Sequence, residues 1–149
     1  MKDKIFQIIK PSTLLKKLKY SNYVDSECLF GENFNLTYIK GVWSFGISVD
    51  DKYQGWVKSN SLGFYPKTTH VISSTRSFVF SKPDIKSKII CFLPLTSKIN
   101  IVQIKNNWAK LDLAFNKKFN HGFIIKSHIL EKNKVEIDWV KYAEILLST

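Results

Sequence analysis

The residues best suited to chemistry are two cysteines, Cys28 and Cys91, and three histidines, His70, His121 and His128. A catalytic thiolate needs a positioned base and an open, electropositive setting. Both cysteines instead lie in apolar, strand-like runs, where a cysteine is usually a small buried hydrophobe. The cysteines form no Cys-x-x-Cys pair, and the histidines lack the spacing of metal ligands. The sequence therefore predicts no catalytic residue, no metal site and no cofactor.

The basic charge is the second feature that could indicate a function. The 149 residues include 23 Lys+Arg and 12 Asp+Glu, a net charge of +11. Proteins that read nucleic acids favour arginine, whose planar fork matches phosphates and guanine edges. Here Arg76 is the single arginine, and no run of five like charges occurs. We interpret the lysines as a solvated surface and expect no nucleic-acid partner. A basic module that binds nucleic acid or a partner protein is the alternative function.

The elements that position these residues are predicted to be short strands. Residues 33–39 alternate, with Phe34, Leu36 and Tyr38 expected on one face of a half-buried strand. Further strands are predicted over residues 43–49 and 53–57. The second half repeats this plan after about 65 residues, which is typical of a duplicated unit. The pairs that correspond are Trp43 and Trp108, Gly55 and Gly122, and Leu62 and Ile129.

The two ends of the chain follow other patterns. Residues 136–147 carry a broad apolar stripe at helical spacing and predict an α-helix. Residues 11–18 are compatible with one or two helical turns or with a leading strand. The expected fold is all-β, with two tandem small β-barrels followed by one C-terminal α-helix. The expected divisions are an N-terminal extension (1–19), a first barrel (20–67), a second barrel (68–132), and a linker with the helix (133–149).

Six segments together resemble one known family. In order, they resemble its patterns S-x-x-L-F-G-E-x-F, D-G-Y-x-G-Y/W-V, T-H-R-V, L-P-L-G-S, G-F-V-x-x-x-H-L and D-F/W-V-x-x-A-E-x-x-L. The segments are residues 26–34, 50–57, 69–71, 92–97, 122–129 and 138–147. The family is that of NlpC-type cell-wall cysteine peptidases, and the resembling part is their N-terminal pair of bacterial SH3-like domains. The family's P-Y-x-W-G-G segment and its D-C-S-G nucleophile motif do not occur.

The resemblance implies a non-catalytic role. The family cleaves γ-D-glutamyl-L-diamino acid bonds in peptidoglycan peptides, and its first SH3-like barrel closes one end of the substrate groove. We therefore expect a substrate-recognition region whose partners are a peptidoglycan-derived peptide and a peptidase catalytic domain, in cis or in trans. The terminal helix would be the first helix of that domain. Since residues 1–10 are too short and polar for a secretory signal, we expect a cytoplasmic location, no membrane partner and no disulfide.

Three residues are the candidates for binding substrate. The resemblance places Tyr53 at the family's tyrosine and Glu32 at the acid of its L-F-G-E pattern, with Asp51 beside them. An ammonium group needs an anionic acceptor and a wall that blocks longer chains, so these residues would hold the free amine of L-alanine. The alternatives to a binding role are that Tyr53 is a packed strand aromatic, that Glu32 is a solvated turn acid and that Asp51 caps its turn. Lys52 replaces the family's glycine and resists a positive φ, which would change the turn.

Overall fold

The structure is a computed structural model, and it describes residues 4–113, 116 and 118–133. The chain divides into two compact units, Met1–Pro66 and Lys67–Thr149. Within the described residues, no helix has the length and apolar character needed to span a bilayer. The predicted C-terminal helix over residues 136–147 lies outside the described residues.

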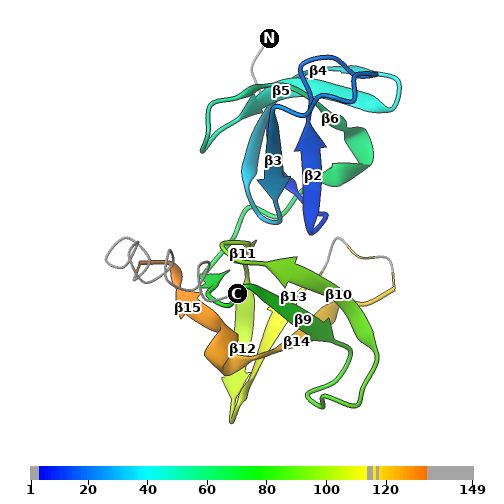
Figure 1. Cartoon of the computed structure of the whole chain (residues 1–149). Helices are drawn as coiled ribbons and strands as arrows, with labels where there is room; N and C mark the ends of the chain where they lie inside the picture. The colour runs from blue at the N-terminus through cyan, green and yellow to red at the C-terminus, as the bar shows by residue number, and fades with distance from the viewer. Residues whose placement is uncertain (1–3, 114–115, 117, 134–149) are drawn as a thin grey trace. The chain divides into compact units, whose positions relative to one another are not determined.

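The first unit is built from short antiparallel strands (Figure 1). Its main sheet has the order β6-β5-β4-β1-β7, and β2 and β3 form a separate pair. Its elements are β1 (Lys4–Ile8), β2 (Ser12–Leu15), β3 (Ser26–Leu29), β4 (Asn33–Lys40), β5 (Trp43–Ser48), β6 (Gln54–Lys58), the 3-10 turn η1 (Ser59–Ser61) and β7 (Leu62–Gly63).

The N-terminal residues are part of this unit. In β1, Phe6 pairs with Phe34 of β4, and Ile8 pairs with Leu62 of β7. The next strand, β2, pairs along its length with β3. Residues 4–8 and 12–15 are therefore strands of the first unit, which corrects the expectation of an extension over residues 1–19. The helical turn considered for residues 11–18 is also wrong, because burial alternates along β2 as it does in a half-buried strand.

A small apolar core lies between the sheet and the β2–β3 pair. It contains five buried residues, against which Leu36 and Leu62 pack: Ile8, Leu15, Cys28, Phe34 and Val57. Burying one side chain of this size stabilises a fold by about 1.5–3 kcal/mol. Gly46 of β5 allows β4 and β5 to approach closely, because a Cβ atom at this position would collide with the carbonyl oxygen of Asn35 in β4.

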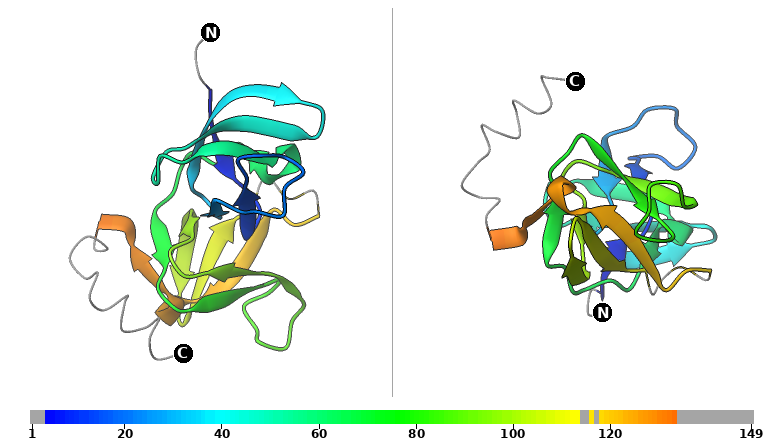
Figure 2. Two further views of the ribbon diagram at one scale, coloured as in Figure 1. Left: turned by 45° about the horizontal axis from the view of Figure 1, so that its top comes forward. Right: turned by 90° about the horizontal axis from the view of Figure 1, so that it is seen from below.

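The second unit is also built from short antiparallel strands. Five of its strands form a sheet in the order β10-β9-β14-β13-β12, and three form another in the order β11-β8-β15. Its elements are β8 (His70–Ile72), β9 (Arg76–Phe80), β10 (Ile89–Pro94), β11 (Lys98–Ile99), β12 (Ile101–Lys105), β13 (Trp108–Asp112), β14 (His121–Ile125), the 3-10 turn η2 (Lys126–His128) and β15 (Ile129–Glu131). Figure 2 shows β12, β13 and β14 side by side in yellow-green to orange.

The two units share two specific local features. In each, the last short strand follows a 3-10 turn and pairs antiparallel with the first strand. In each, a two-residue turn with a positive φ precedes a tryptophan: Gly41 (φ 63°) before Trp43, and Asn106 (φ 57°) before Trp108. The all-β prediction is confirmed for the described residues, where the helical elements are 3-10 turns.

Candidate functional site

Glu32 lies in the tight turn between β3 and β4. Gly31 enters this turn with a φ of 83°, which an L side chain rarely adopts. The amide of Glu32 donates to the carbonyl of Leu29 at 3.1 Å, and its own carbonyl accepts from the amide of Ile8 at 3.0 Å. The main chain of Glu32 is therefore held from two sides, by β3 and by β1.

Asp51 and Tyr53 lie in the loop between β5 and β6. The amide of Ser48 donates to the carbonyl of Tyr53 at 2.9 Å, which closes the loop. The amide of Val49 donates to the carbonyl of Asn33 at 3.0 Å, which ties the loop to the residue after Glu32. Within the loop, Lys52 has a φ of 60°. It therefore takes the left-handed conformation that a glycine would take, and the turn is formed despite the lysine.

The electrostatics of Cys28 report on the carboxylates around it. Its thiol pKa is raised from 9.0 to about 12, first by burial and then by Glu32, with smaller contributions from Asp51 and Glu27; the Ser48 hydroxyl opposes the shift. Three carboxylates from different parts of the first unit thus act on one buried thiol. The structure brings Glu32 and Asp51 into the same neighbourhood, and Tyr53 lies two residues from Asp51 with 52% of its surface exposed.

Neither Cys28 nor Cys91 has a thiol activated for nucleophilic attack. Burial raises the pKa of Cys91 to about 11, and the pKa of Cys28 is about 12, so both thiols are protonated at neutral pH. A protonated thiol is a poor nucleophile. No group of three His, Cys, Asp or Glu side chains within residues 4–113, 116 and 118–133 could hold a metal ion.

Two histidines have structural partners in the second unit. His128 Nδ1 lies 2.8 Å from the hydroxyl of Ser77, and His70 Nδ1 lies 2.8 Å from the hydroxyl of Thr69. Burial lowers the pKa of both imidazoles, and for His70 the carboxylate of Glu131 opposes the shift. Each of these two imidazoles thus has a hydroxyl group within hydrogen-bond distance.

The sequence did not predict an aromatic row on the outer face of the first unit. Tyr38 pairs with Phe45 across β4 and β5, and Phe45 pairs with Trp56 across β5 and β6. Their ring centroids are 5.2 Å and 5.0 Å apart, and Lys19 Nζ lies 4.8 Å from the Trp56 ring. Tyr38 is on this face because a β-bulge follows Leu36 and reverses the alternation. The expectation that Tyr38 shares the face of Phe34 is therefore wrong.

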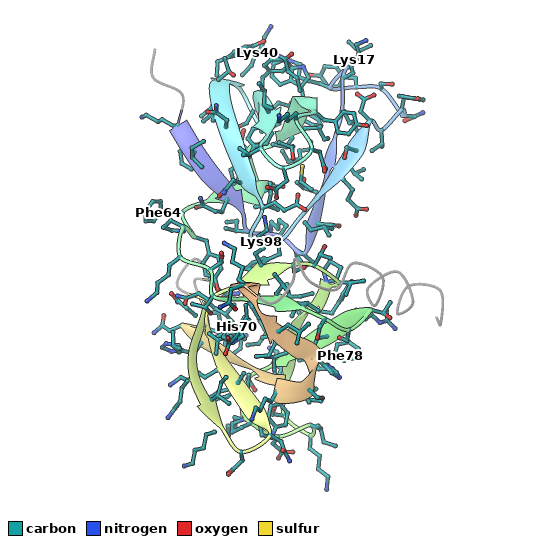
Figure 3. All side chains as sticks on the ribbon, turned by 90° about the vertical axis from the view of Figure 1, so that its left-hand side faces the viewer. Lys17, Lys40, Phe64, His70, Phe78 and Lys98 are labelled. Atoms are coloured by element: carbon teal, nitrogen blue, oxygen red, sulfur yellow. The ribbon has the colours of Figure 1, made fainter. Side chains whose placement is uncertain are left out.

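Phe64, Lys17 and Lys40 are further exposed side chains of the first unit. Figure 3 shows the side chain of Phe64 projecting from the segment after β7, where 76% of its surface is exposed. It also shows Lys17 and Lys40 at one end of the unit, from the β2–β3 loop and the end of β4.

Comparison with known proteins defines the class of this fold. Residues 16–62, within the first unit, match the family model of the bacterial dipeptidyl-peptidase SH3 domain. The resemblance to the SH3-like region of NlpC-type peptidases is confirmed. A search of curated proteins gave no match.

Among solved structures, the fold is similar to that of an NlpC/P60 family protein from Bacillus cereus. The TM-score is 0.68 at 10% identity, over 86% of this chain and 56% of that protein. The chain thus spans little more than half of that protein's length. NlpC2 from Trichomonas vaginalis gives a TM-score of 0.37 at 15% identity, over 88% of this chain and 49% of that one.

Proposed function

We propose that this chain is the non-catalytic substrate-recognition region of a bacterial peptidoglycan-peptide endopeptidase. It binds murein peptides, or packs on the catalytic domain and limits access to the substrate groove. The observation that carries this proposal is that Glu32 and Asp51 both raise the pKa of the buried Cys28 thiol, and that all three residues belong to the segment that matches bacterial dipeptidyl-peptidase SH3 domains. The raised pKa values of both thiols support a chain without its own cysteine nucleophile.

The charge distribution favours an ammonium ligand at this place. In a chain with a net charge of +11, Glu27, Glu32 and Asp51 all act on Cys28. Such a concentration of carboxylates attracts a cation, and a charge-assisted hydrogen bond to an ammonium is about twice as strong as a neutral one. Tyr53, two residues after Asp51 in the same loop, offers a half-exposed ring with a hydroxyl. The free amine of an N-terminal L-alanine fits this chemistry.

A titration tests the binding part of the proposal. The chain is titrated with L-Ala-γ-D-Glu-diaminopimelate and with its N-acetyl derivative, and amide shifts are followed by NMR. We expect shifts at Glu32, Asp51 and Tyr53 with the free amine, and much weaker ones after acetylation. Asp51→Asn should weaken binding about tenfold, which corresponds to losing one charged hydrogen bond.

Asp25→Asn is the matched control for this titration. Asp25 lies in the loop before β3 of the same unit, so it changes the charge equally without touching the proposed site. Equal affinity for the acetylated peptide, or equal weakening by Asp25→Asn, would contradict the proposal.

The absence of catalysis needs its own measurement. The purified chain should leave L-Ala-γ-D-Glu-diaminopimelate intact over a long incubation. Addition of an NlpC-type catalytic domain should restore cleavage if the two associate in trans. Hydrolysis by the chain alone, abolished in a variant lacking both thiols, would overturn the non-catalytic part.

We also propose the cytoplasm, and murein peptide recycling there, as the setting of this function. Both cysteines are free, and they lie in different units, as is common in a reducing compartment. Fractionation of the native host with antibodies to this chain would check the location.

A further inference from the structure

The second unit carries a hollow of about 470 Å³ on the outer face of its larger sheet. This volume lies within the range of about 300–1,000 Å³ that is usual for small-ligand sites. Strands β12, β13 and β14 form its floor, and Pro83 of the β9–β10 hairpin contributes to a wall. The lining residues on which the argument depends are Pro83, Gln103, Lys105, Trp108, Lys110 and Phe123.

Two aromatic rings give the hollow a firm apolar floor. The Trp108 ring meets Phe80 edge to face, with centroids 5.7 Å apart and planes at 89°. Phe80 is buried, so it holds Trp108 in place. Phe123 lies on β14 opposite Lys110 of β13. Such rings bind apolar side chains at low entropic cost because they are already ordered.

The polar lining is cationic. Lys105 pairs with Trp108 across β12 and β13, and Lys110 lies between Gln103 and Phe123. None of the described residues that line the hollow is acidic. Asp84, next to Pro83, accepts a hydrogen bond of 2.9 Å from the amide of Lys86 and is engaged within its own hairpin. Two ammonium groups without a lining carboxylate favour an anionic ligand.

Internal hydrogen bonds form the walls before any ligand arrives. At the hairpin tip, the hydroxyl of Ser87 donates to the carbonyl of Asp84 at 2.6 Å, and the amide of Ser81 donates to the carbonyl of Lys88 at 2.8 Å. On the opposite side, the carbonyl of Asn107 accepts from the amide of Lys126 at 2.8 Å. The hollow is therefore pre-organised, which reduces the cost of binding.

The edge of the sheet indicates what kind of anion fits. Strand β12 is the last strand of its sheet, so its outer edge pairs with no other strand among the described residues. Val102 and Ile104 on β12 are about half exposed. An open edge accepts the backbone of an extended peptide. A nucleic-acid backbone has no amide groups that could pair along such an edge.

We propose that this hollow binds the free carboxylate and an adjoining apolar side chain of an extended peptide. Lys105 and Lys110 hold the carboxylate, Trp108 and Phe123 hold the side chain, and the open edge of β12 leaves room for the rest of the peptide backbone. This site is distinct from the carboxylate cluster of the first unit and selects the opposite charge. It gives the second unit a binding role of its own.

The probe is N-acetyl-Ala-Leu-Ala with a free terminal carboxylate, compared with the same peptide as an amide. Neither has a free amine, so the result is independent of the site around Glu32 and Asp51. With the 149-residue chain, we expect the acid to shift the NMR signals of Asn106, Asn107 and the Trp108 indole, and to leave Tyr53 unmoved. Amidation should weaken binding about tenfold, as should Lys110→Gln.

Lys132→Gln is the matched control, because Lys132 follows β15 on the other sheet and changes the charge equally. It should leave the affinity unchanged. Thermal unfolding of each variant shows whether the fold is kept, and Lys105→Gln replaces Lys110→Gln if that variant unfolds. Equal binding of the amide, no shifts with the acid, or equal weakening by Lys132→Gln overturns the proposal. So does tighter binding of a single-stranded oligonucleotide at the same residues in 150 mM salt, since it would assign the hollow to nucleic acid.

Discussion

The amide of Lys52 donates a hydrogen bond of 2.7 Å to the carbonyl of Ser48, and Lys52 takes a φ of 60°. This bond, together with the one from Ser48 to Tyr53, closes the loop that carries Asp51. The loop thus keeps a glycine-type conformation with a lysine in it. The presentation of Asp51 and Tyr53 depends on a conformation that the side chain of Lys52 opposes.

The first prediction concerns this position. Lys52→Val should lower the free energy of unfolding of the first unit by about 1–2 kcal/mol, because a β-branched side chain is strongly disfavoured in the left-handed region. Lys52→Asn should leave it nearly unchanged, because asparagine tolerates this conformation. Urea unfolding followed by tryptophan fluorescence measures both. Equal stability of the two variants would show that the turn adapts.

Thr96 is a second non-glycine residue with a positive φ, and it lies in the turn between β10 and β11 of the second unit. It has a φ of 71° in the turn that the Ser97 amide closes on the Pro94 carbonyl, where the resembled family has glycine. Thr96→Gly should raise the free energy of unfolding by about 1 kcal/mol, or the melting temperature by about 2–4 °C. Thr75 has no positive φ, so Thr75→Gly should lower stability instead. A loss of stability in Thr96→Gly would contradict strain at this turn.

The raised thiol pKa of Cys28 predicts a loss of stability at alkaline pH. The folded thiol has a pKa of about 12 and the unfolded one a pKa near 9.0, so between these values the folded state binds more protons. Stability is therefore full below pH 9 and falls as the pH rises through this window. Unfolding of the first unit should depend on pH between 9 and 10.5, and Cys28→Ala should flatten that dependence. An unchanged slope in the variant would exclude Cys28 as the cause.

The histidines predict the opposite dependence for the second unit. Burial lowers the pKa of His128 below its ordinary 6.5, so the unfolded state binds the proton more readily. Stability is therefore full above pH 6.5 and is lost as the pH falls further. The melting temperature should drop between pH 7 and pH 5, and less so in His128→Gln. Ser77→Ala should cost about 1 kcal/mol at pH 7, because it removes the hydrogen-bond partner of the imidazole.

Much of the strand structure could be predicted from the sequence. The alternation over residues 33–39 and the runs over 43–49 and 53–57 overlap β4, β5 and β6. These predictions succeed because the direction of a side chain in a strand depends on local backbone geometry. The turn before Trp43 was equally readable, since Gly41 is suited to a positive φ.

Parts of the fold that depend on pairing could not be read in this way. The strand β1 is defined by its neighbours β4 and β7, which follow it by many residues. The bulge after Leu36 depends on how β4 meets β5, and it decides that Tyr38 faces outward. A single inserted residue reverses the faces of all that follow, and local alternation carries no signal of it.

For the candidate site, the residue types pointed to an ammonium ligand, but only folding gathers them. Glu32 and Asp51 come from separate turns, and their common effect on Cys28 arises from the pairing of β4 with β5. The hollow of the second unit likewise needs a hairpin tip and three strands at once. The amino-acid sequence by itself determines the side-chain chemistry and much of the local backbone conformation. Electrostatic neighbourhoods and hollows depend on distances between remote segments, and those distances exist only after the strands have paired.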